Sequence, residues 1–147
     1  MEERRVYLDS SAIVKRYVQE KGTDVVDSVF REAEMGACVV CFSMWNVGEL
    51  ATVLDKVERK GMFNAREVFG TFLRETMRLR RSGSVDVIPV SSHLIERSTL
   101  YVFRHHVYVG DAIQLAASIE ASCDQFITSD KRLGDVAKTE GLQTVVL

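Results

Sequence analysis

Four carboxylates stand where predicted strands end or where the following helices begin. Asp9 ends an apolar run near the start of the chain, and Asp130 follows the apolar run Phe-Ile-Thr. Glu49 lies early in a helix predicted after the second strand, and Asp111 opens an alanine-rich helix. If the first and fourth strands are neighbours, Asp9 and Asp130 come within side-chain reach. The two helices could then bring Glu49 and Asp111 to the same place.

Carboxylates held close together repel, so each needs either a raised pKa or a nearby cation. Mg²⁺ and Mn²⁺ meet this need because they take oxygen ligands and bridge to substrate phosphates. Such an ion polarises a phosphodiester oxygen and lowers the pKa of the attacking water. The pattern therefore indicates hydrolysis of a phosphate ester. The competing interpretation is helix capping and helix-dipole chemistry, which also places acids at these positions. It is weaker for Asp9, since Ser10 and Ser11 are available to cap the next helix, and weaker still for Glu49.

The elements that must position these acids alternate between strand and helix. Short apolar runs predict five strands, at residues 5–9, 37–42, 85–90, 125–128 and 142–146. Capping residues and helical spacing predict helices that begin near residues 10, 23, 43, 64, 91, 111 and 133, with Thr23 as an N-cap. This order is typical of an α/β domain whose parallel sheet is covered on both faces. In such sheets, ligands bind beyond the carboxyl ends of the strands. Pro89 marks the third strand as an edge strand.

Length and composition place the chain among ordinary globular domains. Its 147 residues predict one domain, residues 1–147, and 46% hydrophobic with 27% charged residues exclude disordered and collagen-like classes. A net charge of −2 provides no global positive field for coating nucleic acid, but it permits an enzyme that holds phosphates through a metal ion. We expect no association with a membrane and a cytoplasmic location, because neither a membrane-spanning run nor a signal peptide is evident.

The cysteines and the other charged motifs favour structural roles. Cys38 and Cys41 form a C-x-x-C on a predicted strand, where they would point to opposite faces and bind no common metal. Lys15 and Arg16, one or two turns beyond Asp9, are candidates for steering phosphate or for binding a carboxylate of a partner protein. A cluster of arginines near the end of one predicted helix is best interpreted as a solvated helix face; it consists of Arg74, Arg78, Arg80 and Arg81. For the histidine pair His105 and His106, a loop or surface position is the preferred interpretation.

Four segments together carry a resemblance to a known family. Asp9 stands in Val-Tyr-Leu-Asp-Ser-Ser-Ala-Ile-Val-Lys-Arg-Tyr, and Glu49 in Val-Gly-Glu-Leu after Ser43. Asp111 stands in Val-Gly-Asp-Ala-Ile-Gln-Leu-Ala-Ala, and Asp130 in Phe-Ile-Thr-Ser-Asp-Lys-Arg-Leu. In this order and spacing, they resemble the PIN-domain family, especially the small VapC-type toxin ribonucleases of prokaryotic toxin–antitoxin pairs. The resemblance covers essentially the whole chain.

The resemblance implies a fold, a reaction and partners. The fold is a three-layer α/β/α arrangement with a five-stranded, mostly parallel sheet in the order 3-2-1-4-5. The reaction is Mg²⁺- or Mn²⁺-dependent endonucleolytic cleavage of RNA. Members commonly form homodimers and are held inactive by a cognate antitoxin protein.

The resemblance also implies roles for individual residues. The four acids form the catalytic cluster, in which Asp9 and Asp111 are the firmest metal ligands and Asp130 joins or supports them, while Glu49 completes it. Ser10 and Thr128 match small hydroxyl positions that orient the carboxylates; the full set is Asp9, Ser10, Glu49, Asp111, Thr128 and Asp130.

Two positions depart from the family pattern. Gln114 stands where many members have histidine, and we expect this to affect packing more than chemistry. Gly48 precedes Glu49 and loosens its helix by up to about 1 kcal/mol relative to Ala.

Two other classes of protein remain open from the sequence. A PIN-like binding or regulatory module could retain the acids with little or no nuclease activity. Another Asp–Mg²⁺ enzyme, such as a phosphatase or a phosphoacceptor domain, is disfavoured. The segment Asp9-Ser-Ser lacks the Asp-x-Asp motif of such phosphatases, and the first strand lacks the paired acids of a phosphoacceptor domain.

Overall fold

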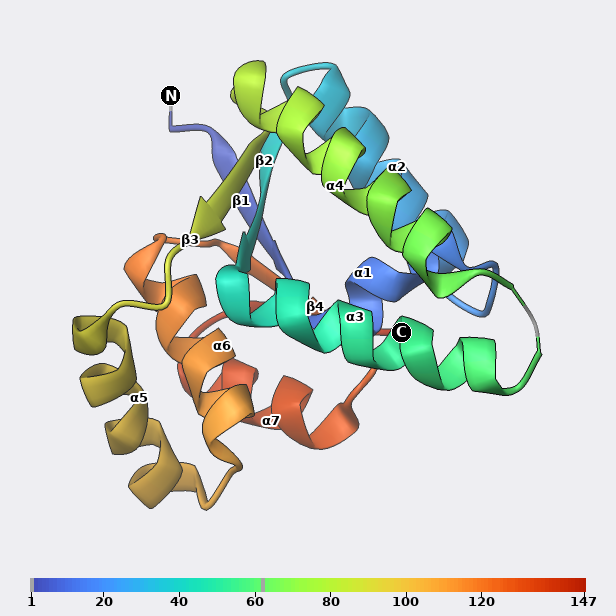
Figure 1. Ribbon diagram of the computed structural model, residues 1–147. Helices are drawn as coiled ribbons and strands as arrows, with labels where there is room; N and C mark the ends of the chain where they lie inside the picture. Colours follow the sequence, from blue (N-terminus) through green and yellow to red (C-terminus); the bar gives the residue numbers. More distant parts are fainter. Residues whose placement is uncertain (1, 62) are drawn as a thin grey trace.

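The computed structural model of the protein describes residues 2–61 and 63–147, and its strands form a parallel sheet (Figure 1). The strand order is β3-β2-β1-β4-β5, as the family resemblance implies. Pro89 follows β3, which lies at one edge of the sheet as expected. The strands are β1 Arg4–Leu8, β2 Cys38–Ser43, β3 Val85–Ile88, β4 Gln125–Thr128 and β5 Gln143–Val146.

The helices cover both faces of the sheet and make the three layers that the resemblance implies (Figure 1). Helices α1, α2 and α4 pack on one face, and α5, α6 and α7 lie on the other. Helix α3 leaves the end of β2 and contacts α1, α4 and α6, so it lies across the carboxyl edge of the sheet. The helices are α1 Ser10–Tyr17, α2 Thr23–Glu34, α3 Met44–Arg59, α4 Ala65–Arg81, α5 Ser92–His105, α6 Val109–Glu120 and α7 Lys131–Thr139.

Alternation along the strands separates two hydrophobic cores. Val6 and Leu8 of β1 belong to the core under α1, α2 and α4, whereas Tyr7 between them belongs to the core under α5, α6 and α7. Cys38 and Cys41 divide between the two cores in the same way. The expectation that these two thiols point to opposite faces is therefore confirmed, because neighbouring strand residues alternate in direction.

Three helix starts differ from the sequence-based expectations. Gly22, with φ +94°, is the N-cap of α2, while the Thr23 hydroxyl instead donates to the Lys15 carbonyl oxygen. Helix α6 begins at Val109 rather than at Asp111, which places Asp111 in its first turn. Helix α7 begins at Lys131, directly after its N-cap Asp130, rather than at residue 133.

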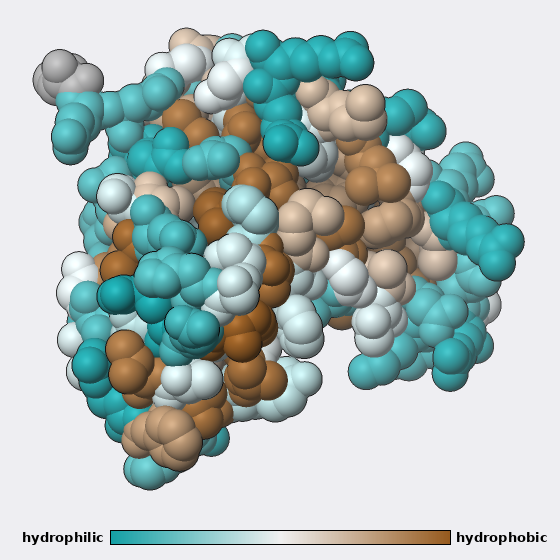
Figure 2. Space-filling model, turned by 60° about the vertical axis from the view of Figure 1, so that its left-hand side comes forward, coloured by the Kyte–Doolittle hydropathy of each residue, from teal (hydrophilic) through white to brown (hydrophobic). Residues whose placement is uncertain are grey.

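The surface has no single dominant character on the side that carries α5. Figure 2 turns this side forward and shows hydrophobic surface interrupted by hydrophilic side chains. Phe103 and Leu100 of α5 are exposed, by 79% and 54%. Among the helices built from residues 2–61 and 63–147, none combines the length and the apolar character that crossing a membrane requires.

Candidate functional site

The four acids singled out by the sequence line one cleft of about 600 Å³. Asp9 directly follows β1 and Asp130 lies two residues after β4, and these strands are neighbours with Leu8 opposite Ile127. Glu49 comes from the second turn of α3 and Asp111 from the first turn of α6. The cleft lies beyond the carboxyl ends of the central strands, where parallel sheets place their ligands.

Asp9 is buried at the floor of this cleft and is held by hydrogen bonds to both of its carboxylate oxygens. Its Oδ1 accepts hydrogen bonds from the Ser11 hydroxyl at 2.6 Å and from the Ala12 N–H at 3.0 Å. Its Oδ2 accepts one from the Thr128 hydroxyl. Asp9 is thus itself the N-cap of α1, a role that we expected Ser10 or Ser11 to take. Capping does not exclude a site role, since the carboxylate also faces the cleft.

Burial raises the pKa of Asp9 to about 6. The hydrogen bonds from Ser11, Thr128 and the Ala12 N–H oppose this rise because they favour the charged form, whereas the charge of Glu49 adds to it. The energetic cost of a buried carboxylate is therefore only partly offset by its neighbours. A cation at this position would stabilise the charged form.

The carboxylate of Asp111 lies within the electrostatic influence of Asp130 and Glu49. Burial raises the pKa of Asp111, and the charges of Asp130 and Glu49 raise it further, while Arg132 opposes them. The Asp130 Oδ1 accepts a hydrogen bond from the Leu133 N–H, so Asp130 caps α7 as well as lining the cleft. The Asp130 N–H donates to the Thr128 hydroxyl oxygen at 2.9 Å, which links this turn to Asp9.

Glu49 receives two hydrogen bonds on one carboxylate oxygen. The Ser10 hydroxyl donates to Oε1 at 2.8 Å, and the Gln114 side-chain amide donates to the same atom at 3.3 Å. We expected Gln114 to matter for packing more than for chemistry, but the structure places it in the wall of the cleft and in contact with Glu49. Within the part of the chain that the structure describes, Oε2 of Glu49 accepts no hydrogen bond.

Sequence reasoning missed two residues of this site. Asn46 is fully buried in the first turn of α3 and donates to both Ser10 and Gln114. Ser11 donates to Asp9 and accepts from the Ser129 N–H at 2.8 Å, so it joins β1 to the loop after β4. A polar Asn three residues after Ser43, in a segment otherwise poor in polar residues, was the available signal for the first. No local pattern marked Ser11.

The two basic residues after Asp9 have different surroundings. Lys15 is only 8% exposed, lines the cleft and pairs with Glu20 at 3.0 Å. Arg16 instead pairs with Glu75 of α4 and Asp27 of α2, at 3.1 and 2.9 Å, and does not line the cleft. The Arg16 side chain thus joins three helices and does not contribute to the cleft.

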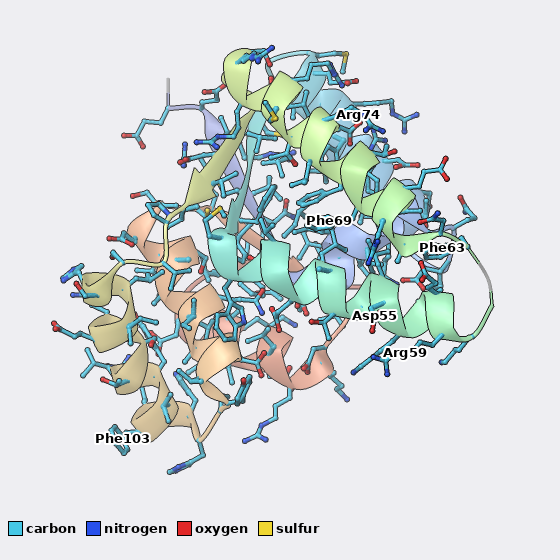
Figure 3. All side chains as sticks on the ribbon, viewed as in Figure 1. Asp55, Arg59, Phe63, Phe69, Arg74 and Phe103 are labelled. Carbon is cyan, nitrogen blue, oxygen red and sulfur yellow. The ribbon has the colours of Figure 1, made fainter. Side chains whose placement is uncertain are left out.

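The arginine cluster and the histidine pair lie away from the cleft. Arg78 pairs with Glu34 at 2.7 Å, and Arg74 extends from the outer side of α4 (Figure 3). His105 is only 10% exposed, with its Nε2 2.6 Å from Glu140 Oε1 and its ring stacked on Tyr101, so it is not a surface residue. His106 is the C-cap of α5. None of these residues lines the cleft that holds the acids.

The donor chemistry of the cleft fits a hard divalent cation. The four acids offer oxygen atoms alone, which suits Mg²⁺ or Mn²⁺ better than a metal that prefers sulfur or nitrogen. Across residues 2–61 and 63–147, no three His, Cys, Asp or Glu side chains form a ready-made metal site.

Two aromatic residues complete the wall near Asp111. Tyr108, the N-cap of α6, is 65% exposed, and Trp45 of α3 lies near it. The Trp45 Nε1–H is buried without a hydrogen-bond partner among the described residues. Gly110 permits this close approach, because a Cβ there would lie 2.7 Å from the Tyr108 ring and 2.9 Å from Trp45 Nε1.

Comparison with known families agrees with this geometry. The model of the PIN domain family matches residues 6–139, which is most of the chain. The protein therefore belongs to the PIN domain family. None of the curated protein sequences matches this chain significantly.

Solved structures with this fold include several VapC proteins. VapC20 from Mycobacterium tuberculosis, described as a sarcin-ricin loop cleaving toxin, has a TM-score of 0.67 at 18% identity, over 97% of this chain and 99% of that one. VapBC2 from Rickettsia felis, bound to a DNA fragment from its promoter, has a TM-score of 0.65 at 12% identity, over 97% and 98%. FitAcB from Neisseria gonorrhoeae has a TM-score of 0.59 at 16% identity, over 95% of each chain. These likenesses extend over the whole fold.

Proposed function

We propose that the protein is a Mg²⁺- or Mn²⁺-dependent endoribonuclease and the toxin of a prokaryotic toxin–antitoxin pair. The observation that carries this proposal is the meeting of four carboxylates from separate elements in one cleft at the carboxyl edge of the sheet. Membership of the PIN family and the likeness to a sarcin-ricin loop cleaving toxin support the same conclusion. A toxin that acts on cellular RNA would work in the cytoplasm.

The residues of the cleft divide the work of phosphodiester hydrolysis. Asp9, Asp111 and Asp130 would supply oxygen ligands to the ion. When bound, the ion polarises a phosphate oxygen and lowers the pKa of the attacking water. The water gives up a proton as its oxygen forms a bond to phosphorus, the bond from phosphorus to a ribose oxygen breaks, and that ribose oxygen takes up a proton.

The remaining polar groups of the cleft hold these acids and the substrate. Thr128 and Ser11 keep both oxygens of Asp9 in place, and Ser10 holds one oxygen of Glu49, Oε1. Glu49, which lines the same cleft, would complete the acidic cluster. Lys15, in the wall of the same cleft, would attract a substrate phosphate.

The test is cleavage of total RNA by the protein purified free of any antitoxin. The reaction is run with Mg²⁺, Mn²⁺ or EDTA, beside Asp9→Asn and a matched control, Asp135→Asn, whose side chain is exposed on α7 and outside the cleft. We expect discrete fragments that require metal, disappear with Asp9→Asn and persist with Asp135→Asn. Circular dichroism checks that both variants are folded.

The second candidate function is that of a PIN-like binding or regulatory module. No cleavage with any metal, together with an Asp9→Asn variant indistinguishable from the wild type, would refute the nuclease and favour the module. The resemblance to VapC-type toxins implies an antitoxin as the partner and a homodimer as the assembly, and we propose both for this protein. Co-expression with the product of the adjacent gene, followed by light scattering of the purified complex, tests both expectations.

A further inference from the structure

A buried polar network lies behind Glu49, and Asn46 is its centre. Asn46 is 0% exposed and makes hydrogen bonds with both ends of its side-chain amide. Its Oδ1 accepts from the Ser43 backbone N–H at 2.8 Å, from the Ser43 hydroxyl at 2.9 Å and from the Tyr7 hydroxyl at 2.8 Å. Its Nδ2 donates to Ser10 Oγ at 2.9 Å and to Gln114 Oε1 at 2.6 Å.

One of these contacts determines the direction of all the others. A backbone N–H can only donate, so the atom of Asn46 that faces the Ser43 N–H must be the carbonyl oxygen. The amide nitrogen of Asn46 therefore faces Ser10 and Gln114, and it can only donate to them. Consequently Ser10 accepts with its oxygen, and Gln114 turns its own carbonyl oxygen toward Asn46.

The direction propagates from these two residues to Glu49. Because Ser10 Oγ already accepts from Asn46, its hydrogen is available for Glu49 Oε1. Because Gln114 Oε1 faces Asn46, Gln114 Nε2 faces Glu49 Oε1. Two donors thus converge on one oxygen of a residue that reaches the cleft, although Asn46 itself does not line the cleft.

We propose that Asn46 is a positioning residue that fixes Glu49 for the reaction by setting the hydrogen-bond direction of Ser10 and Gln114. This role extends beyond packing. Aspartate has the same shape as asparagine but carries an oxygen where Asn46 has its donating nitrogen, so Asn46→Asp removes both hydrogen bonds to Glu49. In Asn46→Asp, the new carboxylate oxygen accepts from Ser10 and from the amide nitrogen of Gln114, and Gln114 then turns an oxygen toward Glu49. This inference rests on the proposed nuclease function only for its activity measurement.

The first experiment compares Asn46→Asp with Asn64→Asp. Asn64→Asp is the control: it makes the same substitution at the exposed N-cap of α4, away from the cleft, and aspartate caps a helix as well as asparagine does. Because Glu49 completes the acidic cluster that attracts the ion, we expect Asn46→Asp to lower RNA cleavage and the affinity for Mn²⁺ alone, measured by calorimetry, by about 10–100-fold. Asn64→Asp is expected to leave both unchanged. Wild-type cleavage and Mn²⁺ affinity retained by a folded Asn46→Asp would overturn the inference.

A combined variant separates positioning from packing. Ser10→Ala with Gln114→Met removes both donors to Glu49 and leaves Asn46 in place. We expect this double variant to reproduce the loss seen in Asn46→Asp. If it keeps at least half of the wild-type cleavage and Mn²⁺ affinity while Asn46→Asp loses them, Asn46 acts by packing and the proposal is wrong.

Nuclear magnetic resonance of the wild-type protein tests the network without any activity or substitution. Both side-chain amide hydrogens of Asn46 are engaged, so we expect their exchange with solvent to be at least tenfold slower than that of Asn64. Exchange at the rate of Asn64 would refute the network. If the wild type cleaves no RNA, the proposed function fails, yet this measurement and Mn²⁺ binding still decide the role of Asn46.

Discussion

At the scale of single residues, the site depends on hydroxyl groups that serve two partners at once. The Thr128 hydroxyl donates to Asp9 and accepts from the Asp130 N–H, so one side chain sets the position of two acids. In the same manner, the Ser10 hydroxyl accepts a hydrogen bond from Asn46 and donates one to Glu49. A hydroxyl suits this task because it offers one donor and two acceptor sites in a small volume.

Tyr108 provides a prediction at this scale. Its ring is 65% exposed beside the acids, and unpaired RNA bases stack on such rings. In an Asp9→Asn background, which prevents cleavage, we expect Tyr108→Ala to weaken binding of a short single-stranded RNA by about 1–3 kcal/mol. Fluorescence anisotropy measures the dissociation constant.

Two controls accompany this prediction. Tyr108→Phe keeps the ring and should bind the RNA as tightly as the parent. Phe103→Ala removes an exposed ring from α5, whose side chain points away from the body of the molecule (Figure 3), and should have no effect. Equal losses from Tyr108→Ala and Phe103→Ala would show that Tyr108 has no special part in binding.

At the scale of elements, α3 is the helix on which the site depends most. It carries Asn46 and Glu49 across the carboxyl edge of the sheet, and Asp55 and Arg59 pair farther along it at 2.9 Å (Figure 3). Gly48 lies in the same turn as Glu49, where an added Cβ meets no atom within 4 Å. This helix therefore contains a glycine that packing does not require.

The two helical glycines near the site should respond oppositely to alanine. Gly48→Ala is expected to raise the free energy of unfolding by up to about 1 kcal/mol, because alanine costs less backbone entropy in a helix. Gly110→Ala is expected to lower it, because the added Cβ collides with Tyr108 and Trp45. Urea denaturation measures both. A stabilising Gly110→Ala would mean that the two rings move aside freely.

Glu75 joins α4 to α1 and makes stability depend on pH. Its carboxylate accepts hydrogen bonds from Arg16 and Tyr17 at 2.8–3.1 Å. Although burial acts in the opposite direction, the hydrogen bonds from Arg16 and Tyr17 lower the pKa of Glu75 below the ordinary 4.5. A lowered pKa means that the folded state favours the charged carboxylate. Its stabilisation is present above pH 4.5 and is lost as the pH falls through the folded-state value.

The corresponding variant is Glu75→Gln. At pH 7 we expect it to lower the free energy of unfolding by about 1–3 kcal/mol, since it removes a charged hydrogen-bond acceptor. The difference from the wild type should shrink as the pH is lowered below 4.5, in urea denaturation at a series of pH values. Glu96→Gln, exposed on α5, serves as the control. A difference that grows in acid would contradict the assigned direction.

At the scale of the whole molecule, two cores on opposite faces of one sheet enclose the three cysteines. Cys38 lies in one core, and Cys41 and Cys123 lie in the other; all three are free thiols. Burial raises the pKa of the Cys38 thiol, which reduces the reactive thiolate further.

The thiols should therefore report on global unfolding. We expect fewer than one thiol per chain to react with a disulfide reagent under native conditions, and all three to react in denaturant. Absorbance of the released thiolate counts them. A single cysteine that reacts in the native state as fast as free glutathione would show that one of the cores opens locally.

The sequence by itself determined the order of the elements and the positions of the acids along them. Apolar runs of four to six residues and capping residues such as Ser43 and Asn64 are local signals, so strands and helices followed from them within a few residues. Because parallel strands end at one edge, Asp9 and Asp130 were expected together once their strands were neighbours. The strand order came from the family resemblance, since no local pattern encodes which strands pair.

Only the tertiary structure decided which side chains meet. Asn46 and Gln114 are 68 residues apart in sequence, and Ser11 and Ser129 are 118 apart. Such contacts depend on the strand order, on the angles at which helices cross and on the side-chain rotamers. None of these features produces a periodic pattern in the sequence. The same reason explains why Arg16 turns to Glu75, while its neighbour Lys15 lines the cleft. Successive helix positions point about 100° apart, and only the packed helices determine which direction faces the site.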